Sequence, residues 1–146
     1  MKPIPIVYDK YENEIGFTQE TTNEEDHVHK PLPGIDTTRK IKFYTWGKRL
    51  HSPIECDLVF DASSFSARTT VDVRSMCGLD DVVQQSILNH PNFDLLIERV
   101  IGLIEEKQPT TVGIFCNYGK HRSVAWTELL KKLYYPDSVC VHQFKN

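Results

Sequence analysis

The sequence has no apolar run approaching the roughly 20 residues that a membrane-spanning helix needs. Its first residues, MKPIPIVYDKYENE, also lack the apolar core and small-residue cleavage site of a signal peptide. We therefore expect a cytoplasmic protein with no contact to a membrane. The chain has 146 residues, of which 40% are hydrophobic and 25% charged. These values are ordinary for one globular domain with a buried core.

The chain has no CxxC pair among its four cysteines. The widely spaced positions are Cys56, Cys77, Cys116 and Cys140. This spacing argues against a zinc site and against a disulfide framework, and it favours reduced thiols. His27 and His29 stand beside acidic residues, but a solvated tail explains them better than a metal site, because nothing holds them in place. We expect neither a metal nor a cofactor.

The chain also lacks an excess of basic residues, and its formal net charge is −3. Residues 1–40 carry eight acidic and five basic side chains, whereas residues 41–146 carry twelve of each. No global positive field attracts nucleic acid, so an RNA contact would depend on a local patch. The acidic segment could instead engage a basic protein partner.

Residues 1–40 differ from the remainder of the chain. The stretch TQETTNEEDHVHKPLPGIDTTRK is polar and has no hydrophobic periodicity, which predicts an irregular, extended or partly disordered N-terminal arm. Within this arm, IPIVYD and IGF could form a short hairpin. We therefore divide the chain into the arm, 1–40, and an α/β domain, 41–146.

A regular pattern begins at residue 41. Strands are predicted over 41–46, 57–60, 111–116 and 138–143, and helices over 80–90, 92–108 and 123–135. This alternation predicts an α/β fold, a three-layer sandwich around a short, mostly parallel sheet of about four strands. The connection 47–56 is barely long enough for a parallel crossover and should hold at most one helical turn. The polar loop 62–80 is long for a compact domain, which favours a functional role.

The most informative segment is FCNYGKHRS, residues 115–123, which joins a predicted strand to a predicted helix. Ligands of open α/β sheets bind beyond the carboxyl ends of the strands, where a helix N-terminus offers N–H donors and a positive dipole. Gly119 permits a backbone that turns successive N–H groups inward. Lys120, His121 and Arg122 add positive charge, and Arg122 can grip a phosphate with two hydrogen bonds. These features predict an anion-binding loop rather than a solvated basic patch.

The loop also fits C-x5-R-S, with Cys116, Arg122 and Ser123 in place, and so resembles the phosphate loop of protein tyrosine phosphatases. That resemblance implies a cysteine nucleophile, an arginine that holds the oxyanion and a separate general acid. Candidates for the acid are Asp61, Asp72, Asp80 and Asp81. We prefer the alternative that Cys116 is a small apolar residue at a strand end. A cysteine-dependent phosphatase is thus the second hypothesis.

A second resemblance extends over residues 41 to 143. CDLVFD (56–61), RSMCGLD (74–80) and IFCNYGKHRSV (114–124) are similar, in order and spacing, to segments of the RapZ C-terminal domain, from the family of RNase adapter proteins. The resemblance implies an anion pocket for a phosphosugar or phosphate and the binding of small regulatory RNAs. We favour a binding domain, which captures a phosphosugar, a nucleotide or an RNA phosphate at residues 116–123, over an enzyme, and leave the phosphatase open as the alternative. Its oligomeric state is left open.

By position in the motifs, the resemblance implies a pocket lined by Asn117, Tyr118, Gly119, His121 and Arg122. The anion-loop hypothesis adds Cys116, Lys120 and Ser123. A family turn resembles Thr45-Trp46-Gly47, with Arg49 following it. The family's pocket histidine falls near Leu50, so His51 either replaces it by a shift of one residue or is an exposed loop histidine. Arg74 belongs to the matched RSMCGLD segment.

The sequence departs from the family pattern at several points. Tyr118 stands where the family has glycine, which narrows the pocket or adds a stacking ring. Ser63 and Ser64 occupy the region where the family has an arginine. No GxxxxGK[ST] loop is present, so we expect a stand-alone form of the domain. The ending VCVHQFKN lacks the family's basic tail, which weakens the RNA hypothesis because phosphate contacts dominate RNA affinity.

Overall fold

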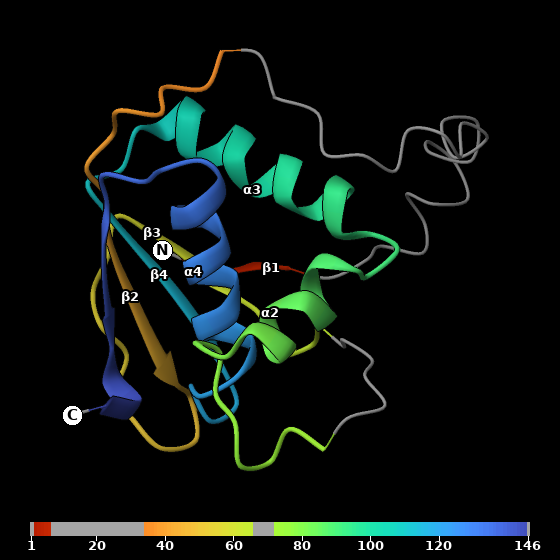
Figure 1. Cartoon of the computed structure of the whole chain (residues 1–146). Coiled ribbons are helices and arrows are strands. Elements are labelled where there is room, and N and C mark those ends of the chain that lie inside the picture. Colours follow the sequence, from red (N-terminus) through yellow and green to blue (C-terminus); the bar gives the residue numbers. More distant parts are fainter. Residues whose placement is uncertain (1, 7–33, 66–71, 146) are drawn as a thin grey trace.

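The computed structural model describes residues 2–6, 34–65 and 72–145 (Figure 1). Within these residues, a single parallel sheet has five strands in the order β1-β3-β4-β2-β5. The strands are β1 (Ile4–Pro5), β2 (Lys42–Gly47), β3 (Leu58–Asp61), β4 (Thr111–Cys116) and β5 (Val139–His142). The helices are α2 (Asp81–Leu88), α3 (Phe93–Lys107), α4 (Arg122–Leu133) and the short 3-10 helix η3 (Gln143–Lys145). None of these helices has the length and apolar character required to cross a membrane.

The α/β class and the parallel sheet are confirmed, but the sheet has five strands rather than about four. The additional strand, β1, comes from the N-terminal arm, and Ile4 pairs with Phe60 of β3. Pro5 is tolerated there because an edge strand can leave one side of its backbone unpaired. The second half of the expected hairpin, residues 15–17, lies outside the described residues, as do His27 and His29.

The direction of each connection explains how the sheet is covered. The steps from β3 to β4 and from β4 to β5 cross the sheet in one direction, so right-handed crossovers place their helices on one face. Figure 1 shows α2, α3 and α4 together on that face. The step from β2 to β3 runs the opposite way, which sends the irregular connection 48–57 to the other face. This connection, rather than a helix, forms the third layer.

The helix-covered face holds the main core. Strand side chains that point into it include Phe43, Leu58, Phe60, Val112 and Ile114, all fully buried. Trp126 of α4 stacks on Phe93 of α3 at a centroid distance of 5.2 Å and meets the edge of Phe65 at 5.3 Å. Burial of these rings is the dominant stabilising contribution, since each removes a large apolar area from water.

The opposite face is smaller and aromatic. Trp46 of β2 stacks on Phe115 of β4 at 5.5 Å. Gly113 lies beneath the indole, and a Cβ there would be 2.6 Å from the ring carbons of Trp46. Pro53, Ile54 and other residues of the connection line a cavity of about 470 Å³ with this aromatic pair.

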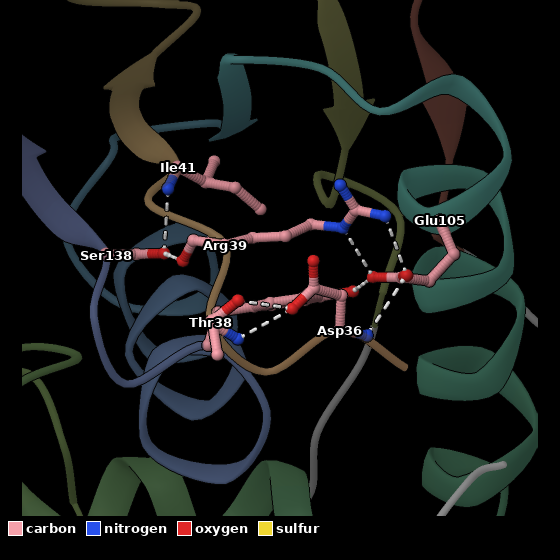
Figure 2. Close-up of polar contacts among 7 residues, drawn as sticks. Asp36, Thr38, Arg39, Ile41, Glu105 and Ser138 are labelled. Atoms are coloured by element: carbon pink, nitrogen blue, oxygen red, sulfur yellow. Dashed lines mark hydrogen bonds and ion pairs between the residues drawn. The ribbon is translucent and has the colours of Figure 1, made fainter. Parts of the chain in front are cut away.

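A polar network fastens the segment before β2 to the helices (Figure 2). The Arg39 guanidinium donates two hydrogen bonds, of 2.9 and 3.0 Å, to the Glu105 carboxylate on α3. The hydrogen bond from Arg39 lowers the pKa of Glu105 below its usual range. On the other side, the Ile41 N–H donates to Ser138 Oγ, which in turn donates to the Arg39 carbonyl. These contacts fix the point at which β2 enters the sheet.

Candidate anion-binding site

The carboxyl ends of β2 and β4 form a topological switch point. These strands are neighbours, yet the connection after β2 leaves toward one face and the connection after β4 toward the other. In open α/β sheets such a divergence leaves a crevice that binds ligands. In Figure 1 both connections lie at the lower edge of the sheet, with the segment 72–80 beside them.

Two glycines allow the two connections to touch through their backbones. A Cβ on Gly119 would lie 2.4 Å from the Gly47 nitrogen, and a Cβ on Gly47 would lie 2.2 Å from the Tyr118 carbonyl carbon. Gly119 also has φ +71°, a conformation that side chains of L-residues disfavour. Hydrogen bonds from Lys48 N to the Cys116 carbonyl (2.9 Å) and from Arg49 N to the Asn117 carbonyl (3.0 Å) hold the connections together. The two connections are therefore in direct backbone contact.

Positive side chains of both connections lie around this crevice. Lys48 Nζ lies 3.3 Å from Ser63 Oγ, which links the end of β2 to the end of β3. Lys120 Nζ donates to the Arg74 carbonyl at 3.4 Å, so the segment after residue 72 reaches the β4 loop. The Arg49 guanidinium lies over the Tyr118 ring, 5.9 Å from its centroid. Four cationic side chains, Lys48, Arg49, Lys120 and Arg122, thus lie on the two connections, with the Asp61 carboxylate at the end of β3.

Arg122 has a second role, as a bracket for the segment after β3. Its Nη1 donates to the carbonyl oxygens of Ser63 and Phe65, the second at 3.2 Å. A guanidinium has five N–H donors, and the described residues offer acceptors to Nη1 alone. Arg122 can therefore hold the β3 loop with one nitrogen and contact an anion with the others.

The two histidines of the site have assignable tautomers. His51 Nδ1 accepts a hydrogen bond from the Gly47 N–H at 2.9 Å, so a neutral His51 carries its proton on Nε2. His121 Nε2 lies 2.9 Å from the Val73 carbonyl, which can only accept, and therefore donates to it. His51 consequently presents an N–H donor, whereas His121 fastens the segment around residue 73 to the start of α4.

Backbone donors are also available at the start of α4. The N–H groups of Tyr118, Lys120 and His121 have no acceptor within the described part of the chain, and the first-turn amides of a helix have no intrahelical partner. The Gly119 N–H donates to Cys116 Sγ at 3.3 Å. These amides and the helix dipole favour an anion at this point.

Cys116 is placed as a core residue. Its side chain is 2% exposed and belongs to the apolar cluster beneath the helices. The thiol lies 3.2 Å from Ser123 Oγ, which is itself fully buried. Asp61, the first candidate for a general acid, accepts a hydrogen bond from the Ser63 N–H at 2.8 Å. The Cys116 thiol and the Asp61 carboxylate therefore make hydrogen bonds within the loops that follow β4 and β3. These contacts favour the interpretation of Cys116 as a small buried residue.

The structure brings most of the predicted site residues together. Residues 116–123, Arg49, His51 and Asp61 lie on the adjoining ends of β2, β3 and β4. Arg74 is different, because its side chain is 91% exposed and pairs with Asp72 at 2.8 Å, while its carbonyl reaches the site. Sequence reasoning missed Lys48, although its position directly after a strand-ending glycine was an available signal.

Comparisons with known proteins agree with this geometry. A family description, the RapZ C-terminal domain, matches residues 39–144. A relative from Shewanella loihica, named "Nucleotide-binding protein", is 31% identical over 120 residues, which cover 75% of this chain and 43% of that protein. The match therefore covers less than half of this relative, and the chain spans about half of its length. The matched range contains strands β2 to β5, the helices that cover them and the crevice. The chain therefore belongs to the RapZ C-terminal domain family.

Proposed function

We propose that this chain binds a phosphorylated small molecule, a phosphosugar or a nucleotide, in the crevice between the β2 and β4 connections. The observation that carries the proposal is the placement of Lys48, on the β2 connection, and of Lys120 and Arg122, on the β4 connection, at one topological switch point. Cationic side chains brought together at a helix start repel one another and oppose the helix dipole, and a bound anion relieves both effects.

The backbone supplies the second part of the recognition. The amides of Tyr118, Lys120 and His121 offer donors without consuming side chains, and His51 adds an Nε2–H. Such a set suits the tetrahedral oxygens of a phosphate better than a planar, neutral group. The name of the Shewanella loihica relative, a nucleotide-binding protein, supports the same ligand class.

Thermal shift and calorimetric titration with inorganic phosphate, phosphosugars, nucleotides and a short RNA test the proposal. Phosphorylated ligands should stabilise the parent, and Arg122→Ala should abolish that stabilisation. Arg122→Ala also removes the hydrogen bonds to the Ser63 and Phe65 carbonyl oxygens. Lys48→Gln is a milder variant, because it leaves these two hydrogen bonds in place. It should weaken binding on the order of tenfold, as expected for the loss of one charged hydrogen bond.

Lys107→Gln is the matched control, since Lys107 is an exposed lysine at the end of α3. Equal affinity of the parent, Lys48→Gln and Arg122→Ala for every phosphorylated ligand would show that the crevice is not the site. If only the short RNA binds, the ligand is a nucleic acid and the small-molecule proposal is wrong.

A further inference from the structure

A second cluster of polar side chains lies at the β5 edge of the sheet. Glu128 comes from α4, and Cys140 and His142 are alternate residues of β5, so both point to the same side of the strand. One donor atom from each lies within 4.8 Å of the other two. The cluster combines a carboxylate oxygen, a sulfur and an imidazole nitrogen, the donor types that bind zinc in proteins.

The cluster is largely withdrawn from solvent. His142 Nε2 lies 2.7 Å from Glu128 Oε2, with side-chain exposures of 5% and 17%. The Cys140 sulfur lies within 4.8 Å of the Glu128 and His142 donor atoms, and its side chain is half-buried. Because Glu128 and Cys140 are partly exposed while His142 is buried, an ion can approach from the sheet edge and reach all three donors.

Thr45 on the neighbouring strand holds the histidine in the orientation that a metal needs. Its Oγ1 lies 2.8 Å from His142 Nδ1, and Thr45 is fully buried. With Nε2 bound to a metal, a neutral His142 carries its proton on Nδ1 instead, and this N–H donates a hydrogen bond to the hydroxyl oxygen of Thr45. Metal-bound histidines usually have such a partner on their second nitrogen, which fixes the tautomer and the ring plane.

A metal that binds as a thiolate complex would displace the Cys140 thiol proton into solvent.

We propose that Glu128, Cys140 and His142 form a binding site for a thiophilic divalent transition-metal ion such as zinc. Three protein donors leave a fourth position, which a water molecule can fill. The ion would join α4 to the edge strand β5, and through Thr45 it would join both to β2. The site is separate from the phosphate crevice and does not depend on the proposed function. Cysteine spacing does not indicate it, because its donors come from two elements and include only one cysteine.

Titration of the metal-free, reduced full-length chain with cobalt(II) tests the proposal. We expect one equivalent to produce near-ultraviolet thiolate-to-cobalt absorption together with visible bands of tetrahedral intensity, and zinc to remove both. Cys140→Ser should eliminate the thiolate band. The matched control is Cys56→Ser, since Cys56 is another half-buried thiol, on the opposite face of the sheet, and it should leave the spectrum unchanged.

Glu128→Gln and Thr45→Val extend the test. Glu128→Gln keeps the size of the side chain but removes the anionic oxygen, and Thr45→Val removes the acceptor for Nδ1–H without changing the volume much. Thr45→Val should lower metal affinity by about 10- to 100-fold, the usual cost of losing a histidine's supporting partner. A parent without thiolate absorption, or a Cys140→Ser variant that retains it, would overturn the proposal. Metal affinity equal to that of the parent in both Glu128→Gln and Thr45→Val would also overturn it.

Discussion

The crevice and the β5 cluster are both polar, yet they are built by opposite means. The crevice is shaped by the backbone, through the contact of Gly47 with Gly119 and the hydrogen bonds between the two connections. The cluster is shaped by side chains, since Glu128 and His142 meet across two elements whose backbones need no special conformation. The crevice requires residues without a Cβ at two positions. The cluster requires particular side chains, whose atoms make the contacts.

The difference predicts unequal tolerance to substitution. Many side chains around the crevice can change while the backbone keeps its shape, but almost any Cβ at the two glycines destroys it. In the cluster, a replacement of similar size preserves the fold and alters only the chemistry. Substitutions at the two sites test this difference.

Gly119→Ala should have the largest effect. A residue with φ +71° costs about 1–3 kcal/mol when it is not glycine, and the new methyl group would overlap the Gly47 backbone. We expect the free energy of unfolding, measured in urea, to fall by about 2–4 kcal/mol, and phosphate-induced stabilisation to disappear. Gly102→Ala is the control, because Gly102 lies in α3 with open space around it and should gain about 0.5–1 kcal/mol. Equal stability of the two variants would contradict a backbone-built crevice.

Glu128→Gln should have an intermediate effect. Loss of a charge-assisted hydrogen bond to His142 predicts a decrease of about 1–2 kcal/mol in the metal-free protein. The pKa of Glu128 is lower in the folded state, so its contribution is complete above the unfolded-state pKa and is lost as pH falls through the folded-state value. Urea unfolding from neutral to acidic pH should therefore show converging stabilities of parent and variant at low pH. A constant difference across that range would place the stabilisation elsewhere.

Cys116→Ser should cost about 1 kcal/mol, because a hydroxyl replaces a thiol in an apolar cluster but keeps both hydrogen-bond partners. Phosphate-induced thermal stabilisation should remain within a factor of about two of the parent. An aryl phosphate assay completes this prediction, since hydrolysis by the parent that vanishes in Cys116→Ser would establish the cysteine-dependent phosphatase instead.

Tyr118→Gly should change ligand choice more than stability. Tyr118 is 54% exposed, and its contact with Arg49 contributes about 0.5–1 kcal/mol at an exposed site. The variant restores the glycine of the family pattern and should widen the range of phosphorylated ligands that give a thermal shift. Tyr118→Phe keeps the ring and should behave as the parent does. If both variants bind the same ligands with the same affinity, the ring does not line the site.

The sequence predicted local structure well wherever one segment determines it. The strand Thr111–Cys116 has the predicted bounds, and α4 begins at Arg122, one residue before the expected start. The helix ends at Leu133 because Pro136 cannot continue it. The position of the anion loop between these two elements follows from the same local pattern.

Features that join distant segments were not visible in the sequence. Strand β1 has only two residues, too few for a periodic pattern, and it exists because β3 offers an open edge. The β2–β3 connection was expected to hold at most one helical turn, and no helix is found there; its position on the far face follows from handedness, a property of the whole sheet. The meeting of Glu128 with His142 and the bracket from Arg122 to Ser63 likewise need the tertiary fold.

The contact between Gly47 and Gly119 also determines how such a domain can diversify. The backbones of the two connections are in direct contact. An inserted residue in one connection would therefore break this contact unless the other connection changed in length as well. The lengths of both loops are therefore constrained. Exposed side chains such as Tyr118 and Arg49 can be replaced without disturbing the backbone contact. Descendants of this fold should inherit the same loop lengths while differing in what those loops carry.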